Sequence, residues 1–213
     1  IIIIIIIIII IIIIKIIIKI IIIKFDKKVF FFIRLYTMVD THVEKVNDII
    51  SNMGYDTHEE CMKQTPTRFS TYIHSFKKKT DDDFVNFCIK HNIKSTPMKD
   101  ASLPVKVTVD SISVHSVCKH HMLPFYGTVC VSYSTRGYTL GLSKFKRIVD
   151  FTSSELTTQE ELTQQIVKHI LLVLPVNELQ VKVECVHSCM IIRGVKDLHT
   201  TTTTEICVNE NEL

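Results

Sequence analysis

The residues best suited to chemistry begin with a short run in the middle of the chain, Cys118–His121. Its Cys-x-x-His spacing can bring a thiolate and an imidazole to one ion. A second soft pair, His187 and Cys189, follows later. Cys118, His121 and Cys189 together offer three zinc ligands, which leaves the fourth position to a water molecule whose pKa zinc lowers to near 7. The spacing therefore predicts a catalytic zinc site.

Two histidines remain beside this set of ligands. His120 and His187 would lie near the ion and could transfer protons, because imidazole titrates near physiological pH. The alternative is a structural role, in which Cys185 and Cys189 are small buried apolar residues of a strand.

A second group follows Gly141. Ser143, Lys144 and Arg147 would place a hydroxyl and two cations near a helix N-terminus, an arrangement suited to phosphate. The alternative is an ordinary N-cap followed by a solvated helix face. Arg193, four residues after Cys189, could hold an anion near the metal or could end a strand.

Glu160 has two interpretations. It could close a capping box with Thr157 at the start of a helix. Its carboxylate could instead accept two N–H bonds from the edge of a guanine base.

The elements that position these residues follow from the hydrophobic pattern. Apolar residues recur at helical spacing from Asp40 to Gly54. Thr57 with Glu60 predicts a short capped helix. Thr65-Pro66 begins another helix, with Phe69 on its apolar face. From Pro104 the period changes to two. We expect strands over Val105–Val114, bulged near Asp110, and over Tyr126–Ser134, Leu179–Val186, Cys189–Arg193 and Thr200–Val208, with helices over Ser143–Thr152 and from Thr158 to the residue before Pro175. This order predicts an α+β fold with a mostly antiparallel sheet.

Composition separates the N-terminal segment of the chain from the remainder. Of the first 23 residues 21 are Ile, interrupted by Lys15 and Lys19. The tract is typical of an AT-rich repeat read as protein or of a disordered extension, and a membrane anchor is the alternative. We divide the chain into a low-complexity tract (1–24), a transition (25–39), a helical region (40–103) and a catalytic region (104–213), with 40–213 forming one domain.

Charge and cysteine usage limit the classes of function. The formal net charge is +3, and without the lysines of the tract it is about zero. The body therefore has no nucleic-acid footprint. Seven cysteines, an odd number, are spread along the chain and predict reduced thiols, some of them on metal, in a cytoplasmic protein and not a disulfide framework.

Taken in order, these motifs closely resemble GTP cyclohydrolase I over roughly residues 40–208. The motifs that carry the resemblance are Thr-Pro-Thr-Arg (65–68), Ser-Val-Cys-Lys-His-His-Met-Leu-Pro-Phe (116–125), Gly-Leu-Ser-Lys with Arg-Ile-Val (141–149), Gln-Glu-Glu-Leu-Thr-Gln-Gln-Ile (159–166), His-Ser-Cys-Met (187–190), Arg-Gly-Val (193–195) and the threonine run 200–204. The resemblance implies the tunnelling fold (T-fold), a homodecamer with active sites between subunits, and conversion of GTP to 7,8-dihydroneopterin triphosphate and formate in pterin and folate synthesis.

The resemblance also implies roles for single residues. Cys118, His121 and Cys189 would ligate zinc, while His120 and His187 would transfer protons. Glu160, with Gln159 beside it, would hold the guanine edge. The triphosphate would contact Ser143, Lys144, Arg147, Arg193 and Arg68, with Arg68 and Arg147 reaching a neighbour's site.

Three positions depart from the family pattern. Lys119 stands where the family usually has Glu, Thr71 where it has Lys, and Glu155 where it has Arg. We expect an active enzyme with weakened GTP affinity. The alternative is a T-fold subunit that has lost turnover and keeps a structural or regulatory role. A pyruvoyl-tetrahydropterin synthase is more distant, because its zinc is held by three histidines.

Overall fold

A computed structural model describes residues 42–100 and 103–209 of the chain. The chain divides into two compact units, residues 1–74 and 75–213. The isoleucine tract and the transition at 25–39 lie outside the described residues, so the interpretations given for them stay predictions. Within the described ranges, no helix is both long enough and apolar enough to cross a membrane.

The first unit is helical. Its first helix covers residues 42–52 and is followed by Gly54, whose φ of 89° suits a residue without a side chain. Residues 57–64 form turns, so the short capped helix predicted there is wrong. The Asp56 carboxylate accepts the His58 N–H at 2.8 Å, an Asx turn that competes with a helix cap. Helix α2 (Thr65–His74) begins at the predicted position, although Phe69 is largely exposed.

The second unit contains the sheet. Strands β2 (Lys106–Cys118), β3 (Pro124–Thr135), β6 (Val176–His187) and β7 (Thr202–Asn209) pair antiparallel in that order. Strand β5 (Leu156–Thr157) pairs parallel with the end of β2. A separate two-stranded sheet joins β1 (Thr96–Pro97) to β4 (Tyr138–Thr139).

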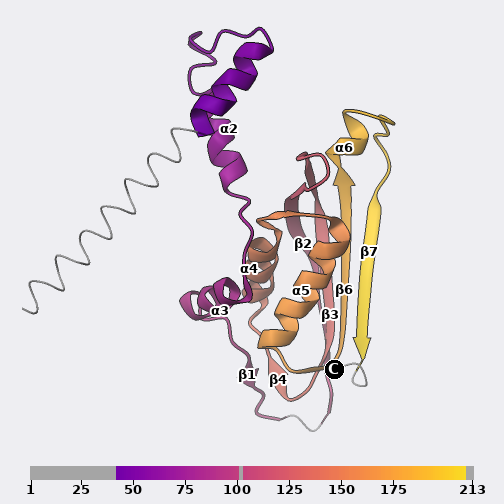
Figure 1. Cartoon of the computed structure of the whole chain (residues 1–213). Helices are drawn as coiled ribbons and strands as arrows, with labels where there is room; N and C mark the ends of the chain where they lie inside the picture. The colour runs from indigo at the N-terminus through magenta and orange to yellow at the C-terminus, as the bar shows by residue number, and fades with distance from the viewer. Residues whose placement is uncertain (1–41, 101–102, 210–213) are drawn as a thin grey trace, which may run out of the picture. The chain divides into compact units, whose positions relative to one another are not determined.

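Two helices pack against the sheet. Helix α4 (Leu142–Ser153) contacts β2, and α5 (Gln159–Val173) contacts β6 and β7, so both lie over one face (Figure 1). The core between the layers includes Phe145, Ile148, Ile166 and Val181, each fully buried. The predicted α+β class is confirmed, and the arrangement is that of a T-fold.

The predicted bulge in β2 decides which face Cys118 occupies. Val109 pairs with Val131, but the next pair is Ile112 with Val129, so β2 contains one extra residue. Because side chains alternate, the insertion turns the even-numbered residues after it toward the core. Cys118, which is 5% exposed, therefore ends the strand on the helix-covered side.

Two local predictions are corrected, and a further helix, α3 (Asp81–Lys90), opens on three acidic residues in the second unit. Thr80 and Asp83 form its capping box. The expected strand at Cys189–Arg193 is a single helical turn, α6 (Ser188–Ile191). The capping box of α5 uses Thr158 and Glu161, one residue later than Thr157 and Glu160.

Candidate metal centre and catalytic pocket

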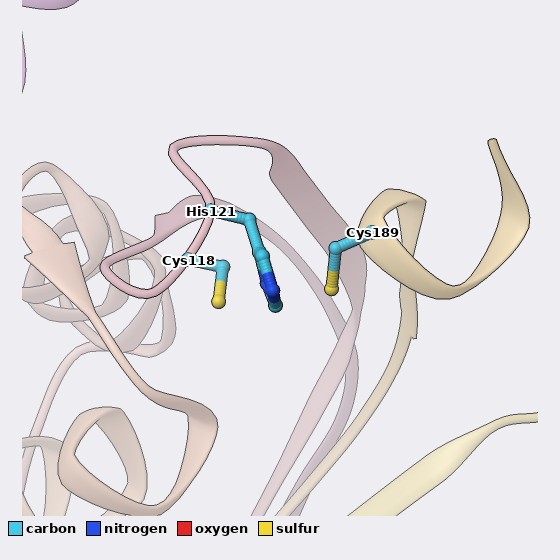
Figure 2. A group of neighbouring side chains, drawn as sticks. All are labelled: Cys118, His121 and Cys189. Atoms are coloured by element: carbon cyan, nitrogen blue, oxygen red, sulfur yellow. The ribbon is translucent and has the colours of Figure 1, made fainter. Parts of the chain in front are cut away.

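A tight turn brings two of the proposed ligands together. Cys118 ends β2, and its N–H donates to the carbonyl of Leu123 at 2.9 Å while its own carbonyl accepts the Met122 N–H at 2.8 Å. This turn carries His121 back over Cys118. Cys189 comes from α6, and the three side chains run side by side in the same direction, with His121 between the two cysteines (Figure 2). Their ligand atoms lie within 4.8 Å of one another.

The donor set fits zinc. Two thiols and one imidazole are the soft and borderline ligands that this ion prefers. Burial raises the pKa of the Cys189 thiol, and the neighbouring Cys118 raises it further. A divalent cation would reverse this effect by stabilising both thiolates. The three residues therefore form a site that could hold a metal.

The pocket beside this group has a volume of about 200 Å³. It brings the three candidate ligands together with His120, Glu160 and His187, as the sequence predicts. Thr158, Gln159, Met190 and Thr202 complete its lining. Thiol, imidazole and carboxylate groups thus share one small cavity.

Glu160 faces this pocket because the helix cap does not use it. Its own backbone N–H and the hydroxyl of Thr158 hold the pKa of the Glu160 carboxyl below its usual range. The carboxylate is therefore ionised at neutral pH. An ionised carboxylate accepts hydrogen bonds, as binding of two adjacent N–H groups requires.

Gln159 is a buried part of the pocket lining. Its side chain is 2% exposed, and its amide nitrogen donates to the carbonyls of Val183 at 3.0 Å and Thr202 at 2.9 Å. Its Oε1 lies 2.8 Å from Nε2 of His187. Both halves of this amide hold protein partners. The prediction that Gln159 binds guanine is not tested by this geometry, which favours a different use of the side chain.

The predicted phosphate ligands lie elsewhere. Lys144 donates to the carbonyl of His91 at 2.8 Å, and Arg147 contacts Nδ1 of His91 at 3.0 Å. They and Ser143 belong to α4 and do not line the pocket. Arg193 follows α6, and its charge acts on the Cys189 thiol. Arg68 belongs to the first unit, where it donates to Gln64 at 3.1 Å.

Lys119, one of the three departures from the family pattern, does not line the pocket. The Lys119 ammonium forms an ion pair with Glu161, and the Lys119 N–H donates to the Thr157 carbonyl at 3.1 Å. Glu155 accepts the Lys79 N–H at 3.2 Å. The Thr71 hydroxyl donates to the Thr67 carbonyl at 2.8 Å. All three departures from the family pattern therefore have protein partners outside the pocket.

Sequence reasoning missed several contributors. Phe125 stacks on the His187 ring, with centroids 4.7 Å apart and planes 11° from parallel. Thr202 belongs to the threonine run, which carried no predicted role, although it accepts a bond from Gln159. Phe125 belongs to the motif at 116–125 and Thr202 to the threonine run 200–204. Membership of these motifs is the sequence signal that could have indicated a place in the site.

Fold and site together define a T-fold protein with a group of side chains that could hold a metal, and comparison with known proteins is more specific. The family model described as GTP cyclohydrolase I matches residues 42–212. The chain belongs to the GTP cyclohydrolase I family.

Individual relatives agree with this assignment. The chain is 36% identical over 156 residues to GTP cyclohydrolase 1 of Bacteroides fragilis, a match that covers 73% of this chain and 77% of that protein. It is 34% identical over 163 residues to GTP cyclohydrolase 1 of Enterococcus faecalis, covering 76% and 83%. A solved structure, an archaeosine synthase QueF-like protein in the apo form, covers 51% of this chain and 95% of its own, with 18% identity and a TM-score of 0.39.

Proposed function

We propose that this chain is a zinc-dependent GTP cyclohydrolase that opens the guanine imidazole ring of GTP and yields 7,8-dihydroneopterin triphosphate and formate. The observation that carries the proposal is the shared pocket, in which Cys118, His121 and Cys189 adjoin two histidines and an ionised carboxylate. When bound there, zinc would supply a Lewis acid that lowers the pKa of water.

The residues of the chain supply recognition and proton transfer. Glu160 would accept the two N–H groups of the guanine edge, which fixes the base in the pocket. His120, next to the ligand His121, would give a proton to the imidazole-ring nitrogen of guanine as the C8–N bond breaks. His187 would assist proton transfer during the second hydrolytic step, which releases formate. The ribose would then rearrange and reclose as the pterin ring.

The size of the pocket indicates that it accepts only part of GTP. Its volume of about 200 Å³ falls below the ~300–1,000 Å³ of most ligand sites. The base fits the pocket best, and the triphosphate would extend outward. We propose that Arg193 holds it from the same chain, with Ser143, Lys144, Arg147 and Arg68 contributing across subunits.

Open sheet edges support assembly. Strand β7 forms one edge of the sheet. Near the opposite edge, the outer side of β2 is paired with the short β5 only at Val117 and Cys118. Among the described residues, most of β2 and one side of β7 thus have no strand partner. Exposed edges favour pairing with another chain, and head-to-tail pairing closes rings. We propose a homo-oligomeric ring within a decamer.

The pairing of Lys119 with Glu161 weakens the case for an inactive subunit, since the added positive charge is neutralised outside the pocket.

The test measures zinc per chain, GTP turnover through the fluorescence of the oxidised neopterin product, and mass by light scattering. We expect about one zinc per chain, turnover that depends on His120, and a multimer. Bound zinc without product would refute the enzymatic proposal, and a monomer would refute the shared site.

A further inference from the structure

We propose that Gln159 is a positioning residue that fixes the tautomer and the ring direction of His187. The carbonyl oxygens of Val183 and Thr202 only accept hydrogen bonds, so the atom of Gln159 that faces them must be its amide nitrogen. The amide oxygen is then the atom 2.8 Å from Nε2 of His187.

This orientation determines where His187 carries its proton. An amide oxygen cannot donate, so Nε2 must be the protonated ring nitrogen. Nδ1 keeps the lone pair, and no described residue forms a hydrogen bond with it. The ring plane is set by Phe125, against which the imidazole stacks. Neutral His187 therefore offers Nδ1, and not Nε2, as its proton acceptor.

The surrounding network prevents the amide from turning over. A flipped amide would place its oxygen against two carbonyl oxygens and its NH2 group against the Nε2–H. Thr204 adds a further acceptor 3.2 Å from the amide nitrogen, and Thr163 donates to the Gln159 backbone carbonyl at 2.8 Å. Thr163 and Thr204 also contact each other at 2.7 Å. One buried side chain thus links α5, β6 and β7 to the rim of the pocket.

The first test reads the tautomer directly and does not depend on turnover. Imidazole ¹⁵N NMR of the histidine-labelled full chain, assigned with His187→Ala, is expected to show His187 protonated at Nε2. Gln159→Met is expected to give a mixture of tautomers. Protonation at Nδ1 in the unmodified chain would overturn the proposal. If Gln159→Met does not fold, the ¹⁵N spectrum of the unmodified chain decides the proposal alone.

The second test rests on the proposed function and asks whether Gln159 acts through His187. Gln159→Met is expected to lower kcat roughly 10- to 100-fold, the usual effect of removing a group that orients a functional histidine. KM for GTP and bound zinc should be unchanged. In a His187→Ala background the same substitution should cost nothing further, and equal losses in both backgrounds would overturn the proposal.

The matched control is Gln164→Met, the same change at an exposed position of α5, which should leave kcat intact. No GTP turnover by the unmodified chain would refute the proposed function while the NMR measurement still decides the tautomer.

Discussion

Gly127 of β3 lies against the backbone of Glu184 in β6, so closely that a Cβ at Gly127 would be 1.9 Å from the Glu184 carbonyl oxygen and 2.8 Å from Cys185 Cα. The two strands run from this contact to the pocket, since Phe125 pairs with His187 two residues further on. Gly127 thus controls the strand spacing near the pocket.

Gly127→Ala is expected to destabilise the protein by about 1–3 kcal/mol, because the added methyl group must push β6 away. Urea unfolding measures this change. Gly141→Ala is the control, since a Cβ there would meet only the Lys144 side chain at 3.7 Å. Equal stabilities of the two variants would show that β6 can move away from Gly127 without a loss of stability.

Cys189→Ser is expected to abolish stoichiometric zinc binding and pterin formation, because a hydroxyl replaces one of the two soft thiolate ligands. Metal analysis of the purified chain and the fluorescence assay report the two effects. Cys207→Ser changes an exposed thiol on β7 and should retain zinc. Retention of zinc by the Cys189 variant would mean that the metal uses other ligands.

Glu160→Gln is expected to lower kcat/KM for GTP roughly 10- to 100-fold, since a charged acceptor for the guanine edge is lost. Steady-state kinetics checks this. Glu161→Gln is the matched control on the next residue, where the carboxylate pairs with Lys119 instead of facing the pocket. If both variants lose the same activity, helix capping and not base recognition explains the loss.

The ion pair between Lys119 and Glu161 predicts an energetic coupling between the two residues. Both side chains are nearly half exposed, so each single neutralisation, Lys119→Met or Glu161→Gln, should cost only about 0.5–1 kcal/mol of stability. Glutamine can keep the capping-box bond that Glu161 accepts from the Thr158 N–H, so the double variant should cost about as much as either single one. Denaturant midpoints of the four proteins form the cycle, and a double variant with purely additive losses would contradict the pairing.

His169 makes stability depend on acid pH. Burial lowers the pKa of His169 to about 4, and the ring stacks on Phe84 with centroids 3.9 Å apart. The unfolded chain, with a histidine pKa near 6.5, takes up the proton first as the pH falls. The stabilisation is therefore complete above pH 6.5 and is lost between about 6.5 and 4, by at most roughly 3 kcal/mol.

Urea unfolding at pH 7 and pH 5 tests the effect. His169→Phe should remove the difference in stability between the two pH values, because phenylalanine does not take up a proton. The Thr152 hydroxyl still donates to the Ile148 carbonyl at 2.7 Å in this variant. An unchanged pH dependence in that variant would assign the effect to other groups.

The sequence predicted those elements whose pattern is long. The fifteen-residue helix α5 and the bulge in β2 both followed from sustained periodicity, and the Cys-His-Cys group followed from motif spacing. Short apolar runs failed. Cys189–Arg193 is as compatible with a strand as with a helical turn. The bond from the Asp197 N–H to the Met190 carbonyl at 2.9 Å, which joins the following loop to this turn, has no local signature.

Register at the start of α5 was a second limit. Two adjacent threonines and two adjacent glutamates allow either Thr157 with Glu160 or Thr158 with Glu161 to form the capping box. Parallel pairing of Thr157 with Cys118 fixes Thr157 in β5, so the box moves one residue along. Only this tertiary contact, which sequence spacing does not reveal, leaves Glu160 for the pocket.

The positions of the three ligands along the chain also affect folding. Cys118 and His121 come from one hairpin turn, whereas Cys189 follows nearly seventy residues later, beyond α4, α5 and β6. An ion held by all three would bind the folded chain and not the unfolded one, because the ligands come together only when this long loop is closed. The melting temperature would then rise with free zinc concentration. The zinc available to the protein would therefore affect the stability of the fold as well as the activity.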